Sequence, residues 1–199
     1  VKEDELALRR EVGRAELLQY ALRCGAEKPS FSVGHLSVFE KVNPEDPFEG
    51  RTGILRLEMA GNEHESAQLV VASLAGEAKG LKVEFSEFKT EDSIIPPGSW
   101  RWALVDYVHV GPVYDNPPSD FPDPLIQNPS FSVAEGRLRS LWISLRTAPG
   151  QRPGLYRGKI AVVGENQRVE VPAEVEVWGF SLPEKPTMRV NIWFFPNEI

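Results

Sequence analysis

The sequence predicts an all-β protein, an antiparallel β-sandwich of the immunoglobulin-like or jelly-roll-like kind, with one helix in front of it. Three observations predict this fold class. From residue 30 onward, about eight short stretches either alternate apolar and polar residues or run apolar for the length of a strand. Turns rich in glycine and proline separate most of these stretches, in a chain of 199 residues with 17 prolines and 16 glycines. No helical period recurs between the stretches, which disfavours an alternation of strands and helices.

The first element in the chain is a helix, predicted over residues 3–24. Its apolar side chains recur at spacings of three and four, at Leu8, Val12, Ala15, Leu18 and Leu22. Gly25 can end the helix in a left-handed cap, whereas Gly13 weakens its middle. A lone apolar face must pack on something. We therefore expect residues 1–29 to form a connecting arm or to belong to an upstream domain.

The strands follow the helix in order. Their expected ranges are 31–42, 54–60, 67–74, 81–88, 100–110, 139–147, 156–164 and 168–180. The last two are expected to form a hairpin around the Gly164-Glu165-Asn166 turn. Together the strands define a sandwich domain over residues 30–181.

Three aromatic residues in these strands have structural predictions. Tyr156 enters its strand from a turn rich in proline and glycine, so its hydroxyl is expected to bond to the backbone and lock a corner of the sandwich. Trp142 and Trp178 lie among apolar neighbours and are expected to be core residues.

Two stretches break the rhythm of strands and turns. Residues 111–131 contain six prolines and are predicted to be a long, stiffened loop, because proline cannot donate to a central β-ladder. Residues 182–199 are expected to be a linker followed, from Arg189, by the first strand of a C-terminal (β/α)8-type domain. The chain is therefore expected to be the front part of a longer protein.

Composition excludes several classes of function. The formal net charge of −7, the pI near 5.1 and the absence of any basic run disfavour a nucleic-acid binder. No stretch approaches the ~18 consecutive apolar residues of a membrane span. The single cysteine, Cys24, cannot form an internal disulfide, and no CxxC pair indicates zinc, so no cofactor or metal is expected.

The stretch NEHES (62–66), with Gln68 close behind it, brings two carboxylates, one imidazole and two amides within seven residues. His64 has no second His or Cys at metal-ligand spacing, which argues against a metal site. Glu63 and Glu65 are two residues apart and could share one face of a strand, as a glycosidase pair requires, but nothing around them supplies a general-acid environment. The favoured prediction is structural: Asn62 shapes the turn, while Glu63 and Gln68 bond to backbone or to a neighbouring domain.

Aromatic residues near the proline-rich stretch leave two alternatives open. Trp100 and Trp102 share one face of their strand, close to Tyr107, and could stack on sugar rings or be buried against a partner domain. Asp123, held between prolines, is predicted to make a rigid interdomain contact. No catalytic serine motif, dinucleotide fingerprint or phosphate loop occurs, so no catalytic residue is predicted.

Several longer motifs occur in a fixed order. They are NEHESAQLVV (62–71), YVHVGPVY (107–114), FPDPL (121–125), LWISLRTAPGQRPGLYRGKI (141–160) and VEVWGFSLPEKP (175–186). Taken together, they resemble the N-terminal β-sandwich region that precedes the catalytic barrel in glycoside hydrolase family 123 and in related bacterial proteins. This family includes β-N-acetylgalactosaminidases. The resemblance covers residues 31–199 and leaves the helix outside it.

The resemblance implies a division of labour. The sandwich would be a non-catalytic accessory domain of a hydrolase acting on N-acetylhexosamine-containing glycans. An Asp-Glu pair on the barrel, beyond Ile199, would orient the sugar's own N-acetyl group for attack and supply the acid. Bacterial export is also implied, to the periplasm, the cell surface or the medium. One departure concerns the residue before Asn62, usually Arg in the family pattern and Gly61 here, so any contact made by that arginine is lost.

Two other classes of function remain open on the residues alone. A stand-alone carbohydrate-binding module would use Trp100, Trp102 and Tyr107 as its platform for glycans. A structural or interaction domain of a larger assembly would give the N-terminal helix a partner.

Overall fold

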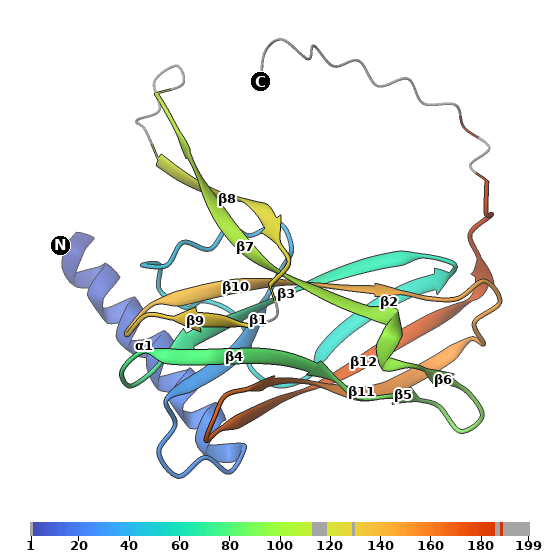
Figure 1. Cartoon of the computed structure of the whole chain (residues 1–199), viewed down its shortest axis with the longest axis horizontal. Coiled ribbons are helices and arrows are strands. Elements are labelled where there is room, and N and C mark those ends of the chain that lie inside the picture. The colour runs from blue at the N-terminus through green and yellow to red at the C-terminus, as the bar shows by residue number, and fades with distance from the viewer. Residues whose placement is uncertain (1, 113–118, 129, 186–187, 189–199) are drawn as a thin grey trace.

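A computed structural model describes residues 2–112, 119–128, 130–185 and 188, which form two packed β-sheets and one helix (Figure 1). Helix α1 spans Lys2–Arg23, and a single 3-10 turn, η1, spans Pro97–Ser99. Every strand pairing among these residues is antiparallel except that of β2 with β12, which is parallel. The predicted all-β sandwich is confirmed.

The first sheet has five strands. In spatial order they are β1 (Phe31–Leu36), β3 (His64–Ser73), β10 (Leu138–Arg146), β7 (Trp100–Val110) and β8 (Ser119–Ile126). The second sheet has seven. Its main path is β2 (Leu55–Gly61), β12 (Arg168–Ser181), β11 (Gly154–Val163), β4 (Ala78–Phe85) and β9 (Phe131–Val133). Off this path, β5 (Phe88–Lys89) pairs with β11, and β6 (Ile94–Ile95) pairs with β5.

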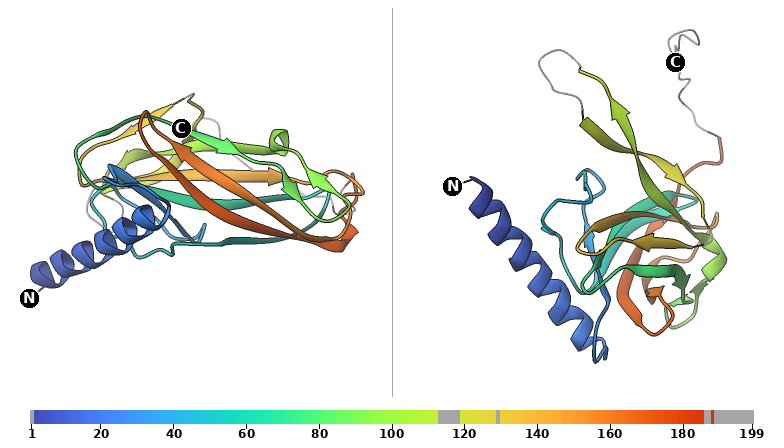
Figure 2. Two further views of the ribbon diagram at one scale, coloured as in Figure 1. Left: turned by 90° about the horizontal axis from the view of Figure 1, so that it is seen from below. Right: turned by 60° about the vertical axis from the view of Figure 1, so that its left-hand side comes forward.

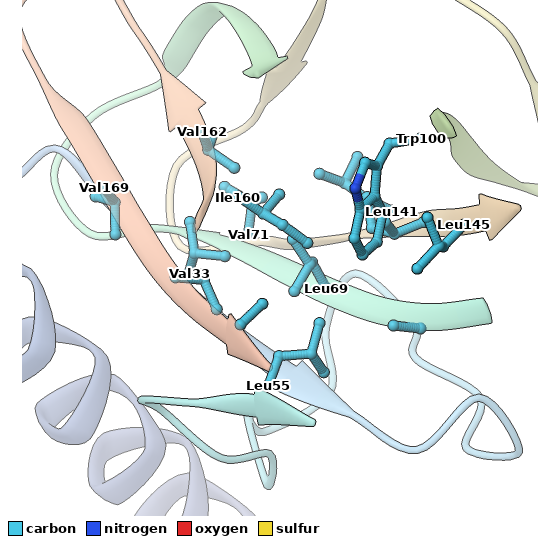
Figure 3. Close-up of a cluster of buried hydrophobic side chains, with 14 of the residues drawn as sticks. Val33, Leu55, Leu69, Val71, Trp100, Leu141, Leu145, Ile160, Val162 and Val169 are labelled. Atoms are coloured by element: carbon cyan, nitrogen blue, oxygen red, sulfur yellow. The ribbon is translucent and has the colours of Figure 1, made fainter. Parts of the chain in front are cut away.

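The core fills the space between the two sheets (Figure 3). Alternation along each strand decides which side chains enter it. On β10 the odd-numbered residues Leu141, Ile143 and Leu145 are buried, and on β12 the odd-numbered positions from Val169 to Val177 are buried. Each fully buried aliphatic side chain contributes about 1.5 to 3 kcal/mol, so this inner layer supplies most of the stabilisation of the sandwich.

The proline-rich stretch contains a strand that the sequence analysis missed. Residues 119–126 form β8, which pairs with β7 through a register that places Pro122 opposite Tyr107. The prediction of a loop is therefore wrong for this part. The physical reason is that β8 lies at the edge of its sheet, where a strand needs donors on one side only and tolerates Pro122 and Pro124.

Other differences concern the lengths of strands. The first strand ends at Leu36 rather than at residue 42, and the predicted strand 81–88 is divided between β4 and β5. The expected hairpin of the last two strands is confirmed, since β11 pairs with β12 and the Gly164 N–H donates to the Gln167 carbonyl at 2.8 Å. The strand expected from Arg189 lies outside the described residues.

Tyr156 locks a corner of the sandwich as predicted. Its side chain is fully buried, and its hydroxyl donates to the backbone carbonyl of Arg152 at 2.7 Å. The Nε2 of Gln151 donates to the same hydroxyl at 2.8 Å. The phenol thereby joins the start of β11 to the turn before it.

Helix α1 forms at the predicted place but packs through a different face. Leu8 and Val12, on the predicted apolar face, expose 64% and 54% of their surface, whereas Leu17 and Ala21 are buried. Gly13 faces the sandwich so closely that a Cβ there would overlap the carbonyl of Phe48. The glycine that weakens the helix on propensity therefore permits its close approach to the sandwich.

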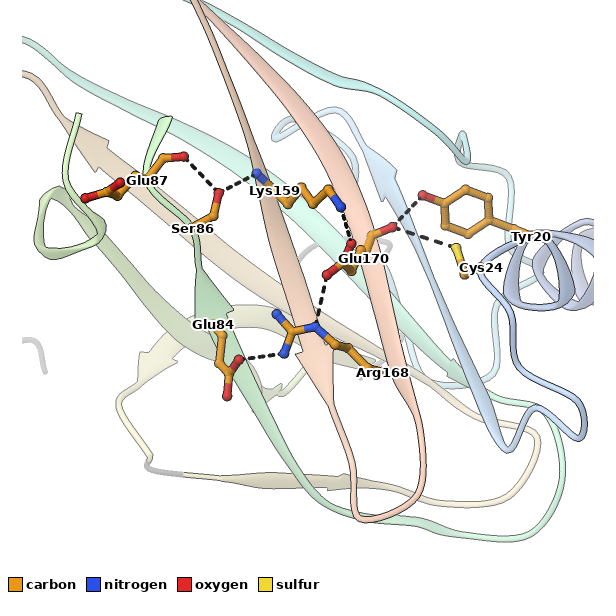
Figure 4. Close-up of polar contacts among 8 residues, drawn as sticks. All are labelled: Tyr20, Cys24, Glu84, Ser86, Glu87, Lys159, Arg168 and Glu170. Atoms are coloured by element: carbon orange, nitrogen blue, oxygen red, sulfur yellow. Dashed lines mark hydrogen bonds and ion pairs between the residues drawn. The ribbon is translucent and has the colours of Figure 1, made fainter. Parts of the chain in front are cut away.

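Polar contacts tie α1 to the second sheet (Figure 4). The Tyr20 hydroxyl donates to the backbone carbonyl of Glu170 at 2.8 Å, and burial raises its pKa, so it remains a protonated donor. The Glu170 carboxylate accepts from Lys159 at 2.6 Å and from Arg168 at 3.1 Å, and these hydrogen bonds lower its pKa. Arg168 also reaches Glu84 on β4 at 2.6 Å. The network spans three strands of the second sheet, β4, β11 and β12.

Within the described part of the chain, no helix is long and apolar enough to cross a membrane.

Candidate functional site

The charged NEHES turn joins the two sheets of the sandwich. Strand β2 ends at Gly61 in one sheet, and β3 begins at His64 in the other. Asn62 adopts a positive φ of 54°, a left-handed conformation that asparagine tolerates better than most residues. Its backbone N–H donates to the Ala148 carbonyl at 3.1 Å, and its side-chain Nδ2 donates to the Leu182 carbonyl at 3.1 Å. Asn62 therefore shapes the turn and also holds the segment that leaves the sandwich after β12.

Glu63 uses its carboxylate to satisfy the backbone of the same turn. Its Oε2 accepts a hydrogen bond of 2.5 Å from the N–H of Ala60, and its own N–H donates to the hydroxyl of Thr147 at 3.1 Å. Thr147 is buried and donates in turn to the Ala60 carbonyl at 2.8 Å. The predicted bonding of Glu63 to backbone is confirmed, and its role at a domain interface stays a prediction.

Gln68 is fully engaged inside the protein. It is 4% exposed, and its Nε2 donates to the carbonyls of Ser37 and Glu40 at 3.1 and 3.0 Å. The Ser140 hydroxyl donates to its Oε1 at 2.9 Å. Gln68 therefore fixes the loop after β1 to the outer face of the first sheet, which again is the predicted bonding to backbone.

The proposed tryptophan platform does not form. Trp100 and Trp102 share one face of β7, as predicted, but that face points into the sandwich. Trp100 is 2% exposed, with its ring centroid 4.7 Å from that of Phe88, and Trp102 packs beside Phe131 at 5.7 Å. A buried indole cannot stack on a sugar, so that alternative is wrong for Trp100. Burial against a partner domain is equally wrong for it, because its contacts are with its own core.

Tyr107 lies away from the two tryptophans. A register shift in the pairing of β7 with β8 lies between Val105 and Tyr107, and Tyr107 pairs with Pro122 beyond it. Its hydroxyl donates to the Val42 carbonyl at 2.9 Å, and burial raises its pKa. The guanidinium of Arg139 lies 5.5 Å from the centre of its ring. These contacts give Tyr107 a structural role beneath the loop of residues 37–42.

Asp123 lines a groove that no sequence pattern indicated. The groove, of about 260 Å³, lies between the loop after β1 and strand β8. Phe39 stands on its rim with 92% of its surface exposed, and Trp142, half-buried on the outer face of β10, contributes to its wall. The ammonium of Lys41, another lining residue, lies 4.6 Å from the centre of the Phe121 ring. The groove thus combines aromatic surface with charged groups of both signs.

An exposed aromatic pair marks the end of β12. Trp178 and Phe180 stack with ring centroids 5.8 Å apart and an interplanar angle of 24°. They expose 39% and 57% of their surface, and Leu182 beyond them exposes 40%. The prediction of Trp178 as a core residue is wrong. Strand phase could have found this pair, because the odd-numbered residues of β12 point inward and both aromatic residues have even numbers.

Gly61 is buried between the turn and the end of β12. A Cβ at this position would overlap the side chain of Ser181, which is its partner in the parallel ladder. Ser181 therefore occupies the space that the side chain of another residue would need. Across the ranges that the structure describes, no group of three His, Cys, Asp or Glu side chains gathers as metal ligands.

Comparison with known proteins gives a family and a structural likeness to a solved member of glycoside hydrolase family 123. The model of the glycoside hydrolase 123 N-terminal domain matches residues 39–164. A family 123 glycoside hydrolase from Clostridium perfringens, described for glycolipid glycan hydrolysis, aligns with a TM-score of 0.69 at 15% identity. The alignment covers 78% of this chain and 28% of that protein, so the chain spans little more than a quarter of its length. No protein of curated function matches the sequence.

A weaker likeness is to the PapD-like domain 7 of human CEP192. It has a TM-score of 0.39 and 8% identity, and covers 77% of this chain and 90% of that domain. A likeness at this level carries no inference about function.

Proposed function

The chain belongs to the glycoside hydrolase 123 N-terminal domain family, and from this premise we propose that it is the non-catalytic accessory domain of a longer glycoside hydrolase. In this proposal residues 30–181 are the accessory sandwich, and residues 182–199 are a linker and the first strand of a catalytic (β/α)8-type barrel. The parent enzyme acts on glycans that contain N-acetylhexosamine. Its acid and orienting carboxylates lie on the barrel, so none of the residues described above is catalytic.

The observation that carries this proposal is the exposed apolar surface at the end of β12. Trp178, Phe180 and Leu182 form this exit patch, and the chain leaves the sandwich there. Clustered exposed apolar residues favour contact with another protein surface. The hydrogen bond from Asn62 to the Leu182 carbonyl holds the exit segment in place beside the NEHES turn. A following domain would bury this patch on docking.

The state of Glu63 supports the non-catalytic assignment. A general acid or base must present a free carboxyl oxygen to its substrate. One oxygen of Glu63 is bonded to the Ala60 N–H, which holds the carboxylate against the backbone of its own turn. The surrounding contacts with Thr147 are those of a structural brace.

The experiment compares this chain with its full-length parent. Both are incubated with a chromogenic β-N-acetylgalactosaminide, with a chromogenic β-glucoside as the control substrate. The parent is expected to cleave the first substrate only, and this chain is expected to cleave neither. Hydrolysis by this chain alone would overturn the accessory assignment, and a parent that cleaves only the β-glucoside would overturn the substrate class.

Glycan binding is a second candidate, favoured by the groove beside Asp123. Phe39 and Trp142 offer apolar faces for the C–H side of a sugar ring, and Asp123 offers a carboxylate for its hydroxyls. Titration with N-acetylgalactosamine oligosaccharides should change the tryptophan fluorescence of the chain. A Trp142→Phe variant should lose that change. If the fluorescence of the unsubstituted chain does not change, the groove is excluded as a glycan site.

A further inference from the structure

Helix α1 has apolar side chains on two opposite faces, and only one of these faces contacts the sandwich. Successive residues of an α-helix are separated by about 100° around its axis. Leu17 and Ala21 lie on the inner face and are buried. Leu8, Val12 and Leu22 lie on the outer face, where they expose 64%, 54% and 47% of their surface. The outer residues Leu8, Val12 and Leu22 take no part in the buried cluster that attaches the helix to the sandwich.

The outer residues have the spacing of a coiled coil. Leu8, Val12, Ala15, Gln19 and Leu22 follow one another at steps of four, three, four and three. This alternation is the heptad seam by which one α-helix packs on another, and a single polar residue within such a seam is a common device for fixing register. We call these five residues the outer seam of α1.

We propose that the outer seam pairs with the outer seam of a second copy of the chain, in an antiparallel arrangement. The seam is self-complementary in that direction. With the two helices centred on each other between Gly13 and Arg14, Val12 lies opposite Ala15 of the second copy. In the same register Leu8 lies opposite Gln19, and Leu22 lies opposite Glu5. The central layers are apolar and the polar residues lie toward the ends.

Charges beside the seam favour this direction. In the antiparallel register Arg9 lies next to Glu16 of the second copy, and symmetry makes this pair twice. Both side chains are exposed, and although Arg9 already pairs with Glu49 of its own chain, its guanidinium has further donors. A parallel pair would instead place Glu11 beside Glu16 of the second copy, which is a like-charge contact. Its favourable contact would be that of Asp4 with Arg9.

The position of the helix leaves room for this partner. The first turns of α1 extend beyond the sheets, and the sandwich lies on one side of the helix only (Figure 2). Two helices that meet through their outer faces therefore keep both sandwiches on the far sides of the pair. At about 1.5 Å per residue, the outer seam from Leu8 to Leu22 is about 21 Å long. This inference does not depend on the proposed hydrolase.

Sedimentation velocity over a range of concentrations tests the association. The chain is expected to change from monomer to dimer between the micromolar and the submillimolar range. Leu8→Glu combined with Val12→Glu should shift that transition at least tenfold upward without changing the melting temperature, because both positions are exposed. Ala7→Glu, on the same helix but off the seam, should leave it unchanged. A monomer at every concentration, or dimerisation that the double variant does not weaken, would overturn the proposal.

Disulfide trapping tests the direction, with Cys24→Ser as the background. A mixture of single variants Glu5→Cys and Leu22→Cys should form a mixed disulfide dimer, while Leu22→Cys alone should not cross-link. Efficient cross-linking of Leu22→Cys alone would show that the two helices pair in a parallel arrangement. Arg9→Glu and Glu16→Arg should each weaken the dimer, and the chain that carries both changes should regain it. If the chain with both changes does not regain dimerisation, the proposed ion pairs between Arg9 and Glu16 do not form.

Discussion

At the scale of single residues, the NEHES turn shows how reactive side chains can serve the backbone. Asn62 supplies a left-handed conformation, Glu63 accepts from a buried N–H, and Gln68 binds a loop. The residue types were visible in the sequence and suggested the bonding, but the partners were not. They come from segments as distant as Thr147 and Leu182, which only the folded chain brings together.

Glu63→Ala should destabilise the chain. The buried N–H of Ala60 loses its acceptor, and an unsatisfied buried donor costs about 1 to 3 kcal/mol. The free energy of unfolding in urea measures this loss, and Glu63→Gln, which keeps an acceptor oxygen, should recover most of it. In the full-length parent, a large loss of turnover with unchanged unfolding would instead assign Glu63 a catalytic role.

Gln68→Leu should cost more than Ser140→Ala. The leucine removes the amide donor from the carbonyls of Ser37 and Glu40 and the acceptor from the buried Ser140 hydroxyl, whereas Ser140→Ala removes only one donor from the group. A loss on the order of 2 kcal/mol or more is expected for Gln68→Leu. Limited proteolysis should also cut the loop of residues 37–41 faster. Equal stabilities for the two variants would show that the loop is held by other contacts.

His35 should make stability depend on pH. Its Nε2 is buried without a hydrogen-bond partner, and burial, followed by the nearby charge of Arg51, holds its pKa below the ordinary value of 6.5. As pH falls through 6.5, the unfolded chain binds a proton that the folded chain resists, so stability falls. Above about pH 7.5 the two states bind equally and the effect disappears. The melting temperature should therefore drop from pH 7.5 to 5.5, and His35→Asn should show a shallower drop. Identical slopes would exclude His35 as the source.

At the scale of elements, the end of β12 differs from the rest of the strand. Its inner residues fill the core as far as Val177, and the exit patch of Trp178, Phe180 and Leu182 then faces outward. Trp178→Ser with Phe180→Ser should leave the melting temperature of this chain within about 2 °C, because exposed side chains contribute little to its fold. The same change in the full-length parent should lower its melting temperature or separate it into two transitions. Val108→Ser, equally exposed on β7, is the matched control. An unchanged parent would argue that no domain docks on this patch.

Strand phase explains what the sequence could and could not predict at this scale. Alternation identified most strands, and the turns between them, because one face of each strand is buried. The same alternation places Trp142 and Trp178 on the outer faces of their strands. They were predicted to be core residues because their neighbours in the sequence are apolar. Strand β8 was missed because the cost of a proline depends on whether a strand lies at an edge, and strand order is a property of the whole sheet.

Helix α1 illustrates the same limit for helices. Its existence and ends follow from periodicity and capping, but a helix with two apolar faces does not say which face packs inward. The face that packs inward is the one that carries Gly13, because a glycine allows the helix to approach Phe48. In α1, the glycine that lowers the predicted helix propensity also lies on the face that contacts the sandwich.

At the scale of the whole molecule, α1 and the sandwich share one hydrophobic cluster. Leu17 and Ala21 pack with residues of the first sheet such as Val70 and Leu138. We therefore expect the helix and the sandwich to unfold together. Leu17→Ala should cost about 2 to 5 kcal/mol, whereas Leu18→Ala, at an exposed position, should cost far less.

Tryptophan fluorescence is the measurement that checks this coupling. No tryptophan lies in α1, and four of the five tryptophans, Trp100, Trp102, Trp142 and Trp178, lie in strands of the sandwich, so the signal reports mainly the sandwich. If the helix and sandwich form one cooperative unit, Leu17→Ala lowers the fluorescence-detected midpoint as much as the midpoint seen by circular dichroism. A shift confined to circular dichroism would make the helix an independently melting arm.

The place of β12 in its sheet has a mechanical consequence. Strand β12 is hydrogen-bonded to β2 on one side and to β11 on the other, whereas side chains attach α1 to the sandwich. Tension applied between α1 and Leu182 would load both ladders of β12 in shear, so that many hydrogen bonds would resist together. The side-chain contacts of α1 with the sandwich, in contrast, would break a few at a time. Under pulling, the molecule would lengthen first by release of α1, while the exit segment kept its hold on the sandwich.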